Sequence, residues 1–268
     1  MTDSSALLNV GFEYPQWEVR ALAADQAEKL ACCDIDPATY GNRADITYFA
    51  HESIMATKHA GITINGSVHM EQTFELRQPV YLGEPLIIRG SVIGVEPDPR
   101  GHRIRSQFDF VRPDGTVPLS TERMSLRIDP DAGTTGPVGS SQTITEPRLA
   151  ELVRVGEKQL HPERVAKFSL DAENLIHSEP EVAKAFGFRA PIAGGLMAVR
   201  FMMEALSASG PPDEIRMVVR FRRPMFWDER LDLFADVDEA PMQTLAVAKA
   251  DGKIANMATV ERFVPGSA

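Results

Sequence analysis

Phe74-Glu-Leu-Arg-Gln-Pro-Val-Tyr-Leu-Gly-Glu-Pro-Leu86 and Val219-Arg-Phe-Arg-Arg-Pro-Met-Phe-Trp-Asp-Glu-Arg-Leu231 follow one pattern. At a fixed offset of 145 residues, the second stretch repeats the proline, glutamate and final leucine of the first, and apolar positions around them coincide. Each stretch predicts a strand, a corner marked by proline and a second strand. The repeat therefore indicates that the chain contains two copies of one folding unit.

Apolar residues alternate with polar or small ones around both corners. In the first copy they are Phe74, Leu76, Val80, Leu82, Leu86 and Ile88, and in the second they are Val218, Phe221, Met225, Leu231 and Leu233. This spacing is typical of an antiparallel sheet with one covered face.

A small, polar segment rich in Gly and Pro, residues 129–142, divides the chain nearly in half. Such composition is typical of a linker between packed units. We therefore predict an N-terminal unit over residues 1–128, a linker over residues 129–146 and a C-terminal unit over residues 147–268.

A second internal match aligns Lys29–Thr39 with Lys167–His177 at a slightly different offset. Each half then contains helical segments followed by strands, which predicts an α+β unit with one long helix wrapped by a curved antiparallel sheet. In the second half the buried central helix is expected at Leu196–Leu206, where Met and Phe recur at helical spacing. The open sheet edges of two such units would pair side by side.

The composition is that of a globular protein, with 43% hydrophobic and 25% charged residues among 268. The net charge of −10 argues against a nucleic-acid partner, because phosphate binding depends on clustered Lys and Arg. The first residues lack a signal-peptide pattern and no stretch is long enough for a membrane span, so a cytoplasmic protein is expected. The two cysteines, Cys32 and Cys33, are adjacent, which predicts reduced, packed thiols.

Residues suited to catalysis are concentrated in Asp171-Ala-Glu-Asn-Leu-Ile-His177 and, shortly after it, in Ala190-Pro-Ile-Ala-Gly-Gly195. A carboxylate, an amide and an imidazole precede a Gly-rich turn that opens the apolar helix. The first backbone N–H groups of a helix are unsatisfied and can receive a developing oxyanion. The segment therefore favours acid/base chemistry on a carbonyl compound.

These two motifs, in the second copy of a duplicated unit, resemble the MaoC-like (R)-specific enoyl-CoA hydratase and dehydratase family, which has a double hot-dog fold. The family signature is Asp-x-Asn-Pro-(Leu/Ile)-His, followed by a glycine 18 positions past the His. Asn174, Ile176, His177 and Gly195 occupy matching positions. The resemblance covers most of the chain and is most specific between about residues 165 and 206.

The sequence departs from the signature in both copies. Ala172 stands at the position of the family's catalytic Asp, with Asp171 as the adjacent carboxylate, and Leu175 replaces the Pro. In the first copy, Asp34-Ile-Asp-Pro37 resembles the start of the motif but Thr39 stands where His would be. The imidazole is therefore expected from the second copy alone, and the first copy is expected to bind the acyl group.

The resemblance implies hydration of a trans-2-enoyl thioester, or the reverse dehydration. Asp171 and His177 would transfer protons, Asn174 would hold the water or the His tautomer, and the Gly195 N–H would contact the thioester oxygen. The implied substrate contacts are Gly194, Ile192 and Met197 for the acyl part, with Arg220 and Arg222 for CoA phosphates. Neither a metal nor a cofactor is expected.

Each of these residues also has a structural interpretation. His177 would serve as a partner for a buried carbonyl, Asp171 as a helix cap, and Asn174 as a turn residue. Gly194 and Gly195 would allow neighbouring elements to pack closely, and Arg220 and Arg222 would lie on the solvent-exposed face of a strand.

The resemblance leaves the reaction open between three alternatives. The first is a lyase acting on CoA or carrier-protein thioesters in lipid or polyketide metabolism. The second keeps the fold but catalyses isomerisation, cyclisation or thioester hydrolysis, since fold does not determine chemistry. The third is a non-catalytic acyl-binding subunit. Association into a homo-oligomer such as a dimer is expected, because exposed sheet edges are commonly covered by a second copy.

Overall fold

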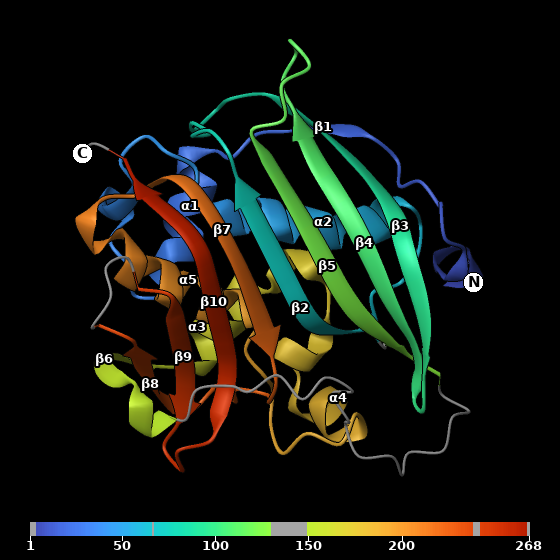
Figure 1. Ribbon diagram of the computed structural model, residues 1–268. Helices are drawn as coiled ribbons and strands as arrows, with labels where there is room; N and C mark the ends of the chain where they lie inside the picture. Colours follow the sequence, from blue (N-terminus) through green and yellow to red (C-terminus); the bar gives the residue numbers. More distant parts are fainter. Residues whose placement is uncertain (1–3, 66, 130–148, 238–241, 267–268) are drawn as a thin grey trace.

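The computed structural model describes residues 4–65, 67–129, 149–237 and 242–266. These residues form a ten-stranded antiparallel sheet that curves around two central helices, α2 and α5 (Figure 1). The strand order is β1-β3-β4-β5-β2-β7-β10-β9-β8-β6. The strands are β1 (Trp17–Val19), β2 (Ser67–Leu76), β3 (Leu86–Asp98), β4 (Gly101–Val111), β5 (Leu119–Ile128), β6 (Val153–Gln159), β7 (Pro212–Phe221), β8 (Arg230–Ala235), β9 (Thr244–Lys249) and β10 (Ile254–Pro265). The helices are α1 (Ala23–Cys32), α2 (Ile46–His59), α3 (Pro162–Phe168), α4 (Pro180–Ala185) and α5 (Gly195–Leu206).

The sheet consists of two five-stranded halves joined edge to edge. Strands β1 to β5 form one half and β6 to β10 the other, and β2 pairs with β7 in register from Glu71↔Arg220 to Leu76↔Ile215. The duplicated α+β architecture is that of a double hot-dog, as the sequence predicts. The predicted linker, residues 129–146, lies outside the described residues except for Asp129, so its boundaries stay a prediction.

The two proline-marked corners have the same local structure. The carboxylate of Glu84 accepts a hydrogen bond from the Tyr81 backbone N–H at 3.0 Å, and that of Glu229 accepts from the Phe226 N–H at 2.9 Å. In both copies the side chain three residues later thus supplies a partner for the backbone N–H of the corner. The repeated glutamate is therefore a structural residue of each corner.

Each corner also holds the start of a central helix. The Ala44 N–H donates to the Val80 carbonyl at 2.8 Å, and the Ala193 N–H donates to the Met225 carbonyl at 2.7 Å. Helix α2 begins two residues after Ala44, and α5 begins two residues after Ala193. The corners thus bring both helix N-termini to equivalent places beside the sheet.

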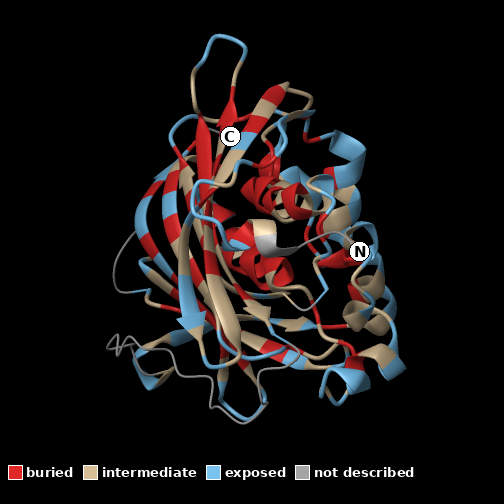
Figure 2. Cartoon of the chain, turned by 90° about the vertical axis from the view of Figure 1, so that its right-hand side faces the viewer, coloured by how far each residue is buried: buried red, intermediate tan, exposed pale blue. Residues whose placement is uncertain are grey.

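The core lies between the sheet and the helices, where buried residues concentrate in Figure 2. Most of α5 is buried, as its apolar sequence predicts. One prediction of the alternating pattern is wrong. Val218 is half-exposed, whereas Ile215, Met217 and Val219 are fully buried. The side chains of β7 alternate strictly along the strand, and this alternation places the odd-numbered positions on the core side.

Cys32 and Cys33 are free and buried, as predicted. Burial raises the pKa of Cys33 to about 12, so this thiol is protonated at neutral pH and a poor nucleophile.

Across the described residues, none of the helices has the length and apolar character needed to cross a bilayer.

Candidate active site

The motif that ends in His177 forms two short 3-10 turns, η4 (Leu170–Ala172) and η5 (Leu175–His177). Glu173 joins them in the left-handed conformation, with φ of 52°, and its carboxylate pairs with Lys58 of α2 at 2.7 Å. The His177 backbone N–H donates to the Asn174 carbonyl at 3.2 Å. These contacts fold the motif back so that His177 faces the segment leading into α5.

The imidazole of His177 is fixed by one hydrogen bond. Its Nδ1 lies 2.7 Å from the Ile192 carbonyl oxygen. A carbonyl only accepts, so Nδ1 carries the hydrogen and Nε2 keeps a lone pair. Burial lowers the pKa of His177 below its ordinary value, and the bond to Ile192 offsets only part of that effect. At neutral pH, His177 is therefore a neutral imidazole with a basic Nε2.

The N-termini of the two central helices differ in one decisive way. Asp45 caps α2, and its carboxylate accepts from the Thr47 N–H at 3.0 Å and from Nε of Arg200 at 2.6 Å. At the equivalent position before α5 stands Gly194, which has no side chain and makes no side-chain cap. The first N–H groups of α5 are thus left without a capping side chain, and the helix dipole favours negative charge there.

Gly195 is also required by packing. A Cβ built on Gly195 would lie 2.7 Å from the Phe221 ring, whereas a Cβ on Gly194 would meet Ser169 Oγ at 3.4 Å. The structural interpretation of Gly195 and its proposed contact with a substrate oxygen are compatible, because both need close approach to the backbone.

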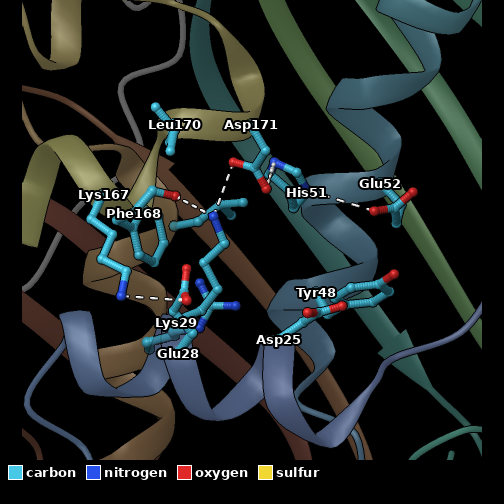
Figure 3. Close-up of a pocket in the computed structure, with 12 residues that line it drawn as sticks. Asp25, Glu28, Lys29, Tyr48, His51, Glu52, Lys167, Phe168, Leu170 and Asp171 are labelled. Carbon is cyan, nitrogen blue, oxygen red and sulfur yellow. Dashed lines mark hydrogen bonds and ion pairs between the residues drawn. The ribbon is translucent and has the colours of Figure 1, made fainter.

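A pocket of about 380 Å³ opens between the two halves, close to the start of α5 (Figure 3). Helices α1 and α2 supply its lining from the first half, and α3, η4 and α5 supply it from the second. The lining residues are Asp25, Glu28, Lys29, Tyr48, His51, Glu52, Lys167, Phe168, Leu170, Asp171, Leu196 and Arg200.

Asp171 lies in this pocket and contacts residues of the other half. Its carboxylate accepts from Lys29 Nζ at 2.9 Å, and its Oδ2 lies 3.4 Å from His51 Nε2 (Figure 3). Burial alone would raise the pKa of Asp171, but His51 and Lys29 lower it far below its usual range. Among the described residues, no hydrogen bond joins Asp171 to His177. The structure therefore keeps Asp171 ionised and paired with the first half.

His51 is a residue of this region that the sequence pattern did not reveal. Burial alone would lower its pKa, but the contacts with Asp171 and with Glu52, 3.7 Å away, raise it above the ordinary value. The first copy has Thr39 at the motif position, but α2 of that copy presents a different imidazole, His51, to the pocket. The expectation that the second copy supplies the catalytic imidazole stays a prediction. A signal was available in the helical spacing of Tyr48, His51 and Glu52, which predicts one polar stripe on a buried helix.

The other predicted residues fall in different places. Met197 is 1% exposed and belongs to the core, while its neighbour Leu196 lines the pocket. Ile192 forms a bridge with Phe226 at the second corner. The tautomer of His177 is held by a carbonyl rather than by the Asn174 side chain, which makes no hydrogen bond within the described part of the chain.

The predicted phosphate contacts lie on and just after β7, outside the pocket. Arg220 pairs with Glu71 at 3.1 Å. The backbone N–H of Arg222 donates to the Ala255 carbonyl, and burial together with Arg223 lowers the pKa of its guanidinium. A role for either residue in binding phosphate stays a prediction. Over the ranges that the structure describes, no cluster of three or more His, Cys, Asp and Glu side chains is placed to hold a metal ion.

Comparison of the sequence with protein-family models and with curated protein sequences gives no match. Comparison of the structure gives many. The chain is similar to HtdX from Mycobacterium tuberculosis, with 20% identity over 91% of this chain and 98% of the other and a TM-score of 0.75. It is similar to a MaoC-like dehydratase from Phytophthora capsici, with 17% identity over 99% of this chain and all of the other and a TM-score of 0.67.

The chain is also similar to an acyl-ACP thioesterase from Bacteroides thetaiotaomicron. Here the identity is 11% over 93% of this chain and 97% of the other, with a TM-score of 0.57. At these identities the likeness establishes the fold. The fold is the double hot-dog of MaoC-like dehydratases, which the motifs around His177 and Gly195 predict from the sequence.

Proposed function

We propose that this double hot-dog protein is a hydratase or dehydratase of α,β-unsaturated acyl thioesters, with His177 as the proton-transfer residue. One observation carries the proposal: the 2.7 Å bond from His177 to the Ile192 carbonyl, three residues before Gly195. It fixes a neutral imidazole next to an uncapped helix N-terminus. A base and an oxyanion contact are the two groups that addition of water to an enoyl thioester requires.

In the hydration direction, Nε2 of His177 accepts a proton from water as the water oxygen bonds to the β-carbon. The electron pair of the double bond moves toward the thioester carbonyl, and the Gly195 N–H stabilises the resulting enolate oxygen. The imidazolium then returns its proton to the α-carbon. The substrate has gained one water and His177 is neutral again. Dehydration follows the same steps in reverse.

The sequence suggests that Asp171 transfers protons, but in this proposal it has a structural role in the pocket. Because Lys29 and His51 hold it ionised, it shapes the pocket while proton transfer rests on His177. Asn174 opens the turn that ends in His177 and is proposed to contact the attacking water. Gly194 and Ile192 keep the backbone of that turn in place.

Thioester hydrolysis is the second candidate. It is favoured by the likeness to an acyl-ACP thioesterase. Free CoA released without any hydroxyacyl product would identify this reaction. Binding of thioesters without turnover would instead point to an acyl-binding subunit.

The test is mass-spectrometric product analysis with short, medium and long trans-2-enoyl-CoA thioesters. We expect the wild type to add one water and His177→Gln to lower the hydration rate by about 10²- to 10⁴-fold, the usual contribution of one proton-transfer group. His102→Gln, at the start of β4 in the first half and not among the pocket's lining residues, is the matched control and should retain activity. Hydration that persists at the wild-type rate in His177→Gln would exclude the proposed role.

A further inference from the structure

The pocket between the halves has one apolar side and one polar side. Phe168, Leu170 and Leu196 form the apolar side and come from the second half, which also supplies the charged residues Lys167, Asp171 and Arg200. Every lining residue from the first half is polar: Asp25, Glu28, Lys29, Tyr48, His51 and Glu52. The first half is where the acyl group of a substrate is expected, so the polarity of this side bears directly on which acyl group fits.

The apolar side lies beside the proposed site, although neither His177 nor Gly195 is among the lining residues. Leu196 directly follows Gly195 at the start of α5. The Phe168 ring lies 3.5 Å from the place that a Cβ on Gly194 would occupy. An acyl chain whose thioester oxygen contacts the Gly195 N–H therefore passes these apolar residues first and reaches the polar side with its far end.

The polar side offers unused donors and acceptors. Lys29 Nζ donates to the Phe168 carbonyl at 2.7 Å and to Asp171, which leaves one of its three hydrogens. Tyr48 and Asp25 make no side-chain hydrogen bond within the described ranges. Burial, with Glu52 and Asp25, raises the pKa of Tyr48, so its hydroxyl keeps a hydrogen to donate.

The charges of the pocket are close to balanced. Three cations, Lys29, Lys167 and Arg200, face four carboxylates, and His51 adds positive charge when protonated. The pocket therefore has no strong preference for a cationic or an anionic ligand, but its polar side presents both hydrogen-bond donors and acceptors. A neutral group that both donates and accepts, such as a hydroxyl, matches it best. An alkyl chain would displace water from these groups without replacing its hydrogen bonds.

We propose that this pocket selects short acyl thioesters whose chain carries a neutral hydrogen-bonding substituent, a hydroxyl above all, over unsubstituted chains of equal length. The volume of about 380 Å³ lies at the lower end of ligand pockets, which fits a short chain. This inference rests on the proposed function in one respect: it takes the thioester oxygen to lie at Gly195.

The test is calorimetric binding of hexanoyl-CoA and 6-hydroxyhexanoyl-CoA. Both are saturated, so neither undergoes hydration and binding is measured apart from catalysis. We expect the hydroxylated thioester to bind at least about tenfold more tightly, since sites built to hydrogen-bond a hydroxyl discriminate strongly against analogues that lack it. Tyr48→Phe, which removes a single hydroxyl, should reduce this ratio, and Lys29→Met should reduce it further.

Arg164→Met is the matched control, because Arg164 also forms an ion pair between the halves, with Asp34 at 3.3 Å, but does not line the pocket. It should leave the binding ratio unchanged. Equal binding of the two thioesters, tighter binding of hexanoyl-CoA, or binding of neither would overturn the inference. Selective binding together with no hydration of 6-hydroxy-trans-2-hexenoyl-CoA would uphold it while rejecting the hydratase proposal.

Discussion

At the scale of single residues, the surroundings shift the pKa values of two histidines in opposite directions. Within the described residues the His177 ring hydrogen-bonds to a carbonyl, and burial lowers its pKa. His51 faces Asp171 and Glu52, which raise its pKa. A neutral imidazole accepts a proton from water and an imidazolium does not, so the lowered pKa favours His177 for proton transfer.

A third histidine makes folding stability depend on pH. Burial, with the charge of Arg123, lowers the pKa of His69 to about 3, and its bond to Gln72 at 3.1 Å does not offset this. The unfolded chain takes up a proton on this residue below about pH 6.5, whereas the folded chain resists protonation down to about pH 3. The free energy of unfolding therefore falls as the pH drops through this window, and His69 has no such effect above it.

We predict that wild type loses about 2 kcal/mol more stability between pH 8 and pH 5 than His69→Gln does. Urea unfolding followed by circular dichroism at both pH values measures the difference. Equal losses in the two proteins would show that His69 does not control this acid sensitivity.

At the scale of elements, the start of α5 combines a requirement of packing with one of chemistry. Gly194 has φ of −61° and ψ of 136°, a conformation open to any residue, and leaves ordinary contact distance for a Cβ. Gly195 leaves only 2.7 Å before the Phe221 ring, which packs against His69 with ring centroids 4.4 Å apart. The two adjacent glycines are therefore not equivalent.

Gly195→Ala should lower the free energy of unfolding by about 1–3 kcal/mol, the usual cost of inserting a methyl group into a packed site. Gly194→Ala should change it by less than about 1 kcal/mol, because restriction of the unfolded chain is opposed by the poor preference for Ala at a helix N-cap. Urea unfolding of the two variants tests this pair. A Gly195→Ala protein as stable as Gly194→Ala would mean that Phe221 moves aside freely.

At the scale of the whole molecule, ion pairs between the halves differ in burial. Arg200 of α5 reaches Asp45 at the start of α2, and the two side chains are 4% and 0% exposed. Lys167 of α3 reaches Glu28 of α1 at 3.3 Å, but both are more than half exposed. Removing one partner of a buried pair leaves an uncompensated charge, whereas exposed pairs are screened by water.

Arg200→Met and Asp45→Asn should each destabilise the protein by about 3–5 kcal/mol, and the double variant by less than the sum of the two. The exposed pair provides the comparison, and Lys167→Met should cost about 1 kcal/mol or less. Thermal and urea unfolding of wild type, the two single variants and the double variant complete this double-mutant cycle, and Lys167→Met is measured beside them. Additive losses at Asp45 and Arg200 would contradict direct coupling of the two central helices.

The sequence by itself determined the architecture. The repeat with Glu84 and Glu229 predicts two equivalent corners, and in the structure both glutamates make the same backbone contact. The apolar run before Leu206 predicts the central helix to within one residue. The corners and the helix depend on periodicity and on short-range contacts, which local residue order encodes. The pairing of His177 with Gly195 comes instead from the resemblance to the family motif.

Only the tertiary structure decided which charges meet. Asp171 appeared to belong with His177, six positions away, but it pairs with Lys29, 142 positions away, and with His51. Spacing along the chain contains no information on such contacts, because they form where the turn η4 of one half packs against α1 and α2 of the other. The same packing created the polar pocket, whose lining comes from segments that share no sequence motif.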